Sequence, residues 1–377
     1  MQFVAINWHV YLLTRSPLAL GLIGLFRAVP IIICSLAGGV VADALDRRKL
    51  LVVTQFVMLS SAALLAAFTV AGLQSVWPIY VLSGLASAAS AFDTPARQSL
   101  MPALVPAEVF PNAVSLGILV FNVATITGPA LGGLLLAESG PALIYGLNAL
   151  SFVAVIAALL LMRTSGDPER DDNSGSGLSL AALKEGFRFV WKTPIIVQTM
   201  TLDFAATFFA SATLLLPIFA KERLHVDARG YGFLAAAPAI GSVITALVMA
   251  RLGSFRKQGR LVVASVAIFG FATAGFGVST VFWFSLLMLA VTGAADTVST
   301  VLRQTIRQLV TPNPLRGRMT SINMMFFMGG PQLGELEAGL LAAAIGAPLS
   351  VVIGGMGSVA SAAVAAIKSR SLMDFEV

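Results

Sequence analysis

The stretch LALGLIGLFRAVPIIICSLAGGVVADALDRRKLLVVTQFVMLSSAALLAAFTVA, residues 18–71, contains two apolar runs separated by a short basic segment. An α-helix of about 20 apolar residues is long enough to cross the hydrocarbon core of a bilayer. Each run therefore predicts one membrane-spanning helix. Similar runs recur along the chain and predict eleven full spans after a shorter first segment. The expected fold class is an all-α polytopic membrane protein.

The expected spans follow the apolar runs from one end of the chain to the other. They cover residues 18–42, 50–71, 77–96, 113–137, 142–162, 195–220, 231–252, 261–278, 282–302, 319–345 and 349–367. The first segment, residues 1–13, rises only about 20 Å as a helix, less than the roughly 30 Å of the hydrocarbon core. We therefore expect the chain to begin inside a first span, so that this helix is incomplete.

The composition also indicates a membrane protein. Charged residues make up 11% of the chain, against about 25% in soluble domains, and 57% of the residues are hydrophobic. The net charge of +6 does not indicate a nucleic-acid-binding protein, because the basic residues are dispersed and form no patch interleaved with aromatic residues.

Cys34, His9 and His225 are the only Cys and His residues. They are too few for a disulfide or a Cys/His metal site, and we expect no cofactor.

The basic residues predict which side of the membrane each loop faces. Nineteen of the 24 Lys and Arg residues fall in alternate loops and in the C-terminal tail. They are Arg47, Arg48, Lys49, Arg97, Arg163, Arg170, Lys184, Arg188, Lys192, Arg251, Arg256, Lys257, Arg260, Arg303, Arg307, Arg316, Arg318, Lys368 and Arg370. Four more lie on the other side, and Arg27 lies within a span. Because cytoplasmic loops retain Lys and Arg, the side with nineteen is expected to be cytoplasmic.

A polar linker divides the chain into two halves. TSGDPERDDNSGSG, residues 164–177, is typical of a disordered linker, and Ser179 is placed to cap a following amphipathic helix on the membrane surface. The expected domains are an N-terminal bundle, residues 1–163, a cytoplasmic linker with this helix, residues 164–193, and a C-terminal bundle, residues 194–377.

The two halves repeat each other. DTPARQSLMPALVP, from Asp93, is similar to DTVSTVLRQTIRQLVTP, from Asp296, and TGPALGGLLLA, from Thr127, is similar to GGPQLGELEAGLLAA, from Gly329. A parallel repeat of six plus six spans is an architecture of secondary transporters, with the substrate held between the halves.

The segment GGVVADALDRRKLL, residues 38–51, resembles the signature loop of the major facilitator superfamily, G-x-x-x-D-R-x-G-R-R/K. Gly39, Asp43, Arg47 and Arg48 match that pattern, whereas Ala44 and Asp46 depart from it. TGPALGG is similar to an element of the superfamily's antiporters. Together with FDTPARQSLMPALVP and GFRFVWKTP, it most resembles the branch of enterobactin-exporter-like and macrolide-efflux-type proteins. The resemblance implies two six-helix bundles that rock around a central site.

The resemblance also implies a role for the loop in gating. Asp43 is placed to accept hydrogen bonds from a helix N-terminus or to pair with an arginine, while Arg47 and Arg48 stay in water or at lipid head groups. A latch of this kind would hold the cytoplasmic gate closed. The alternative is a loop that only determines topology.

Ionisable groups inside the expected spans need a partner or a function, because a charge at mid-membrane costs at least about 2.5 kcal/mol. The resemblance places the spans expected at 18–42 and 319–345 beside each other, so Arg27 is expected to pair with Glu335 or Glu337. The pair would either shape an outer gate or couple protonation to rocking, and a permanent structural bridge is the alternative. Asp203 and Asp296 are candidate proton carriers, because a carboxylate in a partly dry cavity can exchange a proton near neutral pH. Simple hydrogen bonding to hydroxyls is the alternative.

Asp93 is the repeat counterpart of Asp296 but precedes Arg97 by four residues, which predicts a local ion pair at the inner surface.

Glycine and proline motifs inside two expected spans are predicted to allow close helix packing and helix bending, without contacting a ligand. These are Gly128, Pro129, Gly132 and Gly133 in one half, and Gly330, Pro331 and Gly334 in the other.

No P-loop, metalloprotease or nucleophile-elbow motif occurs, so we expect neither ATP hydrolysis nor another enzymatic activity. The predicted function is export of a small amphipathic molecule, a siderophore or a drug, in exchange for protons. A general multidrug or macrolide-type pump and a non-transporting membrane sensor or partner protein are the alternatives. The expected partners are the substrate, the proton gradient and membrane lipids, without nucleic acid. The expected state is a monomer in a bacterial cytoplasmic membrane, with linker and C-terminus cytoplasmic.

Overall fold

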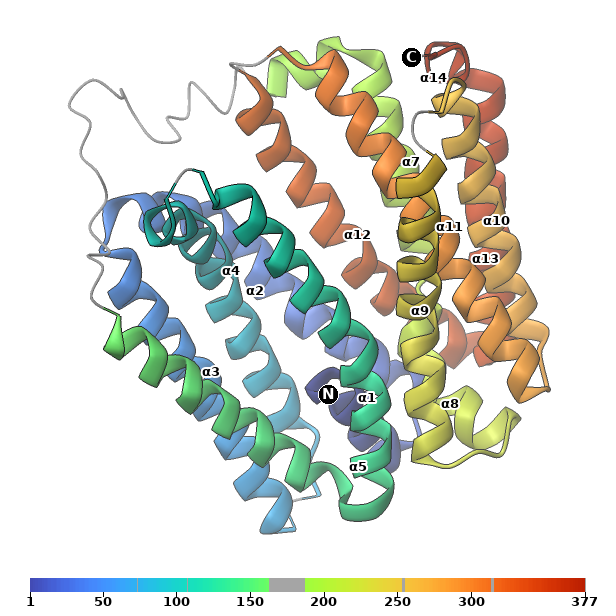
Figure 1. Cartoon of the computed structure of the whole chain (residues 1–377). Helices are drawn as coiled ribbons and strands as arrows, with labels where there is room; N and C mark the ends of the chain where they lie inside the picture. The colour runs from blue at the N-terminus through green and yellow to red at the C-terminus, as the bar shows by residue number, and fades with distance from the viewer. Residues whose placement is uncertain (73, 107, 163–186, 253–254, 313–314, 377) are drawn as a thin grey trace. The chain divides into compact units, whose positions relative to one another are not determined.

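The computed structural model describes the chain except residues 73, 107, 163–186, 253–254, 313–314 and 377, and it leaves out some side chains, including those of 35–44, 316–318 and 324–329. The described residues form helices and connecting turns without strands (Figure 1). The α-helices are α1 (Gln2–Thr14), α2 (Pro17–Ala44), α3 (Arg47–Val70), α4 (Trp77–Leu104), α5 (Phe110–Leu161), α7 (Pro194–Phe209), α8 (Leu216–Ile218), α9 (Ala228–Leu252), α10 (Gln258–Val278), α11 (Phe282–Val310), α12 (Arg316–Ile345), α13 (Ala347–Lys368) and α14 (Arg370–Met373).

The helices follow the expected spans with several differences. The spans expected at 113–137 and 142–162 both lie in α5, which turns sharply where Gly140 has a φ of 70° (Figure 1). Glycine suits that turn because a positive φ brings other residues into steric conflict. The span expected at 195–220 is broken after Phe209 and continues as a 3₁₀ turn (Ala212–Leu215), α8 and a π-helical turn (Phe219–Arg223). In addition, α4 and α11 continue to Leu104 and Val310, beyond the expected ends at residues 96 and 302.

By length and composition, eight helical stretches in the described part of the chain can cross a membrane. The count is lower than the eleven expected spans partly because the two spans within α5 form one continuous stretch, 115–161. The long helices α4 and α12 lie outside this set of eight and carry charged residues, Asp93 and Arg97 in α4 and Glu335 and Glu337 in α12.

The chain forms two compact units. Unit 1 contains Met1–Thr14 and Leu25–Ser179, and unit 2 contains Arg15–Gly24 and Leu180–Val377. In unit 1, α3 packs against α4 and α5, and α1 packs against α5. In unit 2, α11 packs against α9 and α10, α13 packs against α10, and α7 packs against α12 and α13. The expected division at residues 163 and 193 stays a prediction.

Most of the expected linker, including Ser179 and Lys184, lies outside the described residues. Residues 187–192 are helical. Val190 is buried in the core of unit 2, whereas Phe187 and Trp191 stack on each other and are exposed. An amphipathic surface helix needs such an apolar exposed side, but its membrane contact stays a prediction.

Glycines allow the helices of unit 2 to pack closely. A Cβ at Gly293 of α11 would overlap the Pro238 carbonyl of α9, and a Cβ at Gly241 of α9 would overlap the Ala290 carbonyl of α11. Lipid gives no hydrophobic driving force for helix association, so packing at such small residues holds membrane helices together. This contact places α11 firmly against α9.

Candidate functional site

A buried ion pair joins α7 to α11 in unit 2. Arg303 Nη2 lies 2.7 Å from Asp203 Oδ1. The two residues are only 2% and 3% exposed. Each charge would be strongly destabilising alone in a low-dielectric interior, so the pair is stable only while both partners stay charged and in contact.

Two further charged residues of α11 belong to the same cluster. Asp296 precedes Arg303 by seven residues, two helical turns, so the two lie on one helix face. Asp296 interacts with the Thr300 side chain and electrostatically with Arg303 and Asp203. Arg303 Nη2 also donates to Thr300 Oγ1 at 3.1 Å, so Thr300 bridges the turn between acid and base.

Arg307 completes the cluster one turn further along α11. It is 5% exposed and interacts electrostatically with Arg303 and Asp203. Its Nη1 has no hydrogen-bond partner among the described residues. Asp203, Asp296, Arg303 and Arg307 together carry two negative and two positive charges, so the charge cluster is neutral when all four are ionised.

The interpretation of Arg303 and Arg307 as loop residues is therefore wrong, and the side of the membrane near which they lie stays a prediction. Because α11 continues to Val310, both arginines lie within the helix and are buried. The sequence shows that a residue is positively charged, but it does not show whether water solvates that charge or a carboxylate pairs with it. The available signal was the spacing of Asp296, Arg303 and Arg307 at i, i+7 and i+11, which puts all three on one helix face.

Unit 1 contains a second buried carboxylate, Asp93 of α4, which is 6% exposed. Arg97 Nη2 lies 2.7 Å from its Oδ2. From α3, Thr54 Oγ1 and Gln55 Nε2 donate to its Oδ1 at 3.1 and 2.7 Å. Asp93 thus links α3 to α4, and the Arg97 side chain stays 60% exposed. Sequence reasoning did not find Thr54 and Gln55.

The expected loop at residues 38–51 is mostly helical, since α2 ends at Ala44 and α3 begins at Arg47. The Asp46 side chain accepts from the backbone N–H groups of Arg48 and Lys49 at 2.9 and 3.2 Å. Asp46, a departure from the superfamily pattern, is therefore the N-cap of α3, a role to which aspartate is well suited.

Arg47 and Arg48 bind carbonyl groups rather than only water or lipid head groups. Arg47 Nη1 donates to the Ser99 carbonyl of α4 at 3.2 Å. Arg48 donates to the Leu159 and Leu160 carbonyls at the end of α5, at 2.7 and 2.8 Å. The last carbonyls of a helix have no intrahelical donor, which makes them good acceptors. At Gly39 and Asp43 the structure describes only the helical backbone.

Glu335 of α12 lies against the first turns of α2 within unit 2. It is 7% exposed, and a Cβ at Gly24 would lie 3.1 Å from its Oε2. Glu337 is partly buried. Arg27 belongs to unit 1, where its guanidinium lies 5.0 Å from the Phe3 ring in a cation–π contact. Its pairing with Glu335 or Glu337 stays a prediction.

Comparison with known proteins identifies the family. Residues 1–375 match the family described as transmembrane secretion effector, of the major facilitator type. The chain belongs to this transporter family. The enterobactin exporter EntS of Salmonella typhimurium is 27% identical over 363 residues, which cover 94% of this chain and 85% of that protein. The multidrug efflux pump Tap of Mycolicibacterium fortuitum is 26% identical over 355 residues, covering 92% and 86%.

Solved structures of transporters share the fold. The POT family transporter PepTSo has a TM-score of 0.74 at 14% identity, over 98% of this chain and 95% of that chain. The nucleoside transporter NupG has a TM-score of 0.70 at 14% identity, over 99% and 94%. This member of the secretion effector family is therefore a multi-pass membrane transporter with the major facilitator fold, and not an enzyme.

The glycine and proline motifs of this transporter lie at close helix contacts. In unit 1, Cβ atoms at Gly128 and Gly132 of α5 would lie 3.3 and 3.2 Å from backbone atoms of Met1. In unit 2, a Cβ at Gly334 of α12 would overlap the Phe208 carbonyl of α7. Pro129 and Pro331 lie inside their helices, and Ser211 Oγ donates to the Pro331 carbonyl at 3.1 Å. Bending at these motifs during transport stays a prediction.

Proposed function

We propose that this transporter exports a small amphipathic molecule, a siderophore or a drug, in exchange for protons. The observation that carries the proposal is the charge cluster of Asp203, Asp296, Arg303 and Arg307 in a membrane-spanning unit. Ionisable residues in such positions commonly serve ion and proton pathways. EntS and Tap are named as exporters, which supports the outward direction of transport.

The charge balance of the cluster suggests how protonation of one carboxylate changes the interactions of Arg303. Asp203 is directly paired with Arg303, whereas Asp296 lies two turns away and shares Arg303 electrostatically. Asp296 is therefore the better proton acceptor in this proposal. Protonation of Asp296 leaves the cluster with excess positive charge, which strengthens the hold of Arg303 on Asp203. When Asp296 loses the proton, its carboxylate again attracts Arg303, and Asp203 and Asp296 then compete for the same arginine.

This competition would couple proton binding to movement of α11 relative to α7, as alternating access requires. The break between α7 and α8 is compatible with such movement, because discontinuous helices are a recurrent feature of transporter substrate and ion sites. The helix contacts of Arg47 and Arg48 at one end of unit 1 would change as the cytoplasmic gate opens.

Everted membrane vesicles test the proposal. A pH gradient, acidic inside, is established across vesicles that contain the full chain, and enterobactin, a macrolide or a cationic dye is added. Uptake of a compound with simultaneous loss of the gradient supports proton antiport. Uptake that is unchanged after the gradient is collapsed by an uncoupler contradicts proton coupling but keeps transport.

The same compounds also distinguish the two candidate substrate classes, a siderophore and a range of drugs. Transport of enterobactin alone supports a siderophore exporter, like EntS, and transport of several unrelated drugs supports a multidrug pump, like Tap. No transport of any compound by correctly inserted protein would instead favour a non-transporting membrane sensor.

The pairing of Arg27 with Glu335 or Glu337 belongs to the same proposal as an outer gate. Arg27→Glu should impair transport, and Arg27→Glu combined with Glu335→Arg or Glu337→Arg should restore it if the residues pair. The absence of rescue in both combinations counts against the gate.

Single cysteines at residue 170 and in the C-terminal tail, in a Cys34→Ser background, test the cytoplasmic orientation by thiol labelling of intact cells.

A further inference from the structure

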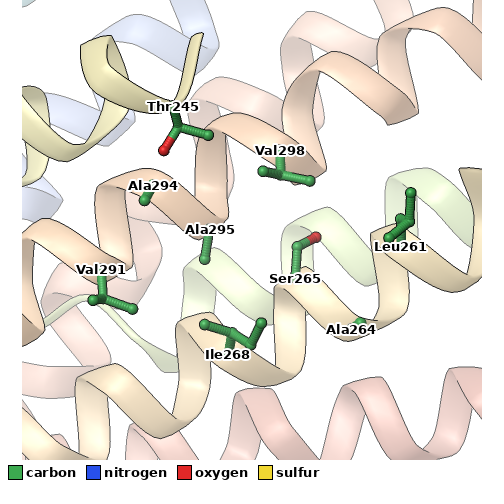
Figure 2. Close-up of a pocket in the computed structure, with 9 residues that line it drawn as sticks. All are labelled: Thr245, Leu261, Ala264, Ser265, Ile268, Val291, Ala294, Ala295 and Val298. Atoms are coloured by element: carbon green, nitrogen blue, oxygen red, sulfur yellow. The ribbon is translucent and has the colours of Figure 1, made fainter. Parts of the chain in front are cut away.

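A groove in unit 2 lies between α9 and α10, and α11 forms its floor. Both helices pack against α11. The groove has a volume of about 240 Å³. Figure 2 shows its lining residues, which are Thr245, Leu261, Ala264, Ser265, Ile268, Val291, Ala294, Ala295 and Val298. In that view Leu261, Ser265 and Ile268 of α10 face α11.

The lining is suited to an apolar chain. Three of its side chains are alanines, which leave room between the helices, and Ser265 Oγ is already bonded to the Val262 carbonyl of its own helix at 2.8 Å. Leu261 and Ile268 at the rim are 36% and 51% exposed. On a membrane-spanning unit, exposed apolar side chains of this kind face lipid tails.

One end of the groove is strongly basic. Arg251 lies in the last turn of α9, and Lys257 and Arg260 lie at the start of α10. All three are exposed, and residues 245–260 contain no Asp or Glu. Arg256 is paired with Glu376 at 3.6 Å. Within the described parts of the chain, Arg251, Lys257 and Arg260 make no ion pair.

The cations and the apolar lining follow each other along α10. Arg260 directly precedes Leu261, and Lys257, the N-cap residue of α10, lies four residues before Leu261. From Leu261 to Ile268 the helix rises about 10 Å, so the groove extends from the cations into the apolar zone. A ligand that fits has an anionic head and an apolar tail.

We propose that this groove binds an anionic phospholipid. The phosphate would contact Arg251, Lys257 and Arg260, and an acyl chain would lie along Ala264 and Ile268 over α11. Basic pockets beside transmembrane helices are suited to anionic head groups, and each near-surface cation contributes about fivefold to affinity, from about 1 kcal/mol. A zwitterionic lipid lacks the net charge that these cations require.

Native mass spectrometry of the purified full chain tests the site. The protein in detergent is incubated with phosphatidylglycerol or with phosphatidylcholine of identical acyl chains. The wild-type chain should retain phosphatidylglycerol at least about fivefold more than phosphatidylcholine. Equal retention of the two lipids would overturn the proposal.

Two sets of variants locate the lipid. Arg251→Gln with Lys257→Gln and Arg260→Gln should remove the preference for phosphatidylglycerol, whereas the matched control Lys368→Gln with Arg370→Gln, exposed cations of α13 and α14, should keep it. Ala264→Phe with Ala294→Phe should reduce retention of both lipids by filling the groove. A head-group variant that keeps the preference, or a control that loses it equally, refutes the site, and thermal unfolding of each variant identifies any that is misfolded.

Discussion

Asp93 in unit 1 and Asp296 in unit 2 lie on repeated segments, and yet their arginine partners make different contacts. Asp93 and Arg97 are four residues apart and pair on one helix. Asp296 and Arg303 are seven residues apart, and Arg303 bonds instead to Asp203 of another helix. Side chains at i and i+4 are neighbours, whereas i and i+7 are about 10 Å apart along the axis.

The different spacing changes what the same residue types do. In unit 1 the carboxylate is satisfied by Arg97, Thr54 and Gln55, and the arginine is mostly exposed. In unit 2 the arginine is buried, pairs with Asp203 and interacts electrostatically with Asp296. The Asp93 site is suited to holding two helices together, and the charge cluster of unit 2 is suited to changing state.

The largest contrast is expected in proton coupling. Asp296→Asn should abolish proton-driven transport because the amide cannot exchange a proton, whereas Asp93→Asn should keep most of it. Loss of the pH gradient on substrate addition to vesicles measures both. Asp374→Asn, in the exposed tail, is the matched control for expression and insertion. Transport by Asp296→Asn at the wild-type rate would remove Asp296 from the mechanism.

A large loss of stability is expected when Arg303 is removed. Arg303→Ala leaves the Asp203 carboxylate buried without its partner, which should lower the free energy of unfolding by about 3–5 kcal/mol. Thermal unfolding in detergent, followed by tryptophan fluorescence, measures the change. Arg256→Ala removes an exposed cation from a surface ion pair and should have little effect. Similar melting of both variants would contradict the assigned role of the ion pair.

A charge exchange should recover part of this loss. Asp203→Arg combined with Arg303→Asp restores opposite charges across α7 and α11, so the double variant should be more stable than either single variant. The same thermal unfolding assay completes a double-mutant cycle. Effects that simply add would indicate that the two side chains do not interact in the membrane.

The smallest effect is expected at the unit 1 ion pair. Arg97→Ala should lower the free energy of unfolding by about 0.2–1 kcal/mol, because the arginine is largely exposed and solvent screens the pair. Thr54 and Gln55 still satisfy Asp93 in this variant. A loss as large as that of Arg303→Ala would show that the two regions are energetically alike.

Several helix boundaries were predictable because they depend on local properties of the chain. The spans expected at 231–252 and 349–367 correspond to α9, Ala228–Leu252, and α13, Ala347–Lys368. An apolar run of the required length has few stable conformations in a membrane other than a helix, since lipid cannot satisfy backbone hydrogen bonds. The family resemblance rested on motifs that are equally local.

The break in the seventh span was not predictable in this way. Residues 195–220 are predominantly apolar and long enough for one span, but the helix ends at Phe209. Around the break, Ser211 bonds to the Pro331 carbonyl of α12, and a Cβ at Gly354 of α13 would overlap the Phe209 carbonyl. These contacts come from residues more than 100 positions away, which no local pattern encodes.

The amino-acid sequence was sufficient to establish the helical membrane class, the approximate ends of the helices and the transporter family, because length, apolarity and motif spacing are properties of the chain alone. Tertiary packing decided which charges are partners. Arg303 and Arg97 follow similar acids in similar segments, but only the position of α7 against α11 places Arg303 next to Asp203. In a low-dielectric interior the nearest opposite charge determines whether an ionised group is stable, and that neighbour is set by the fold.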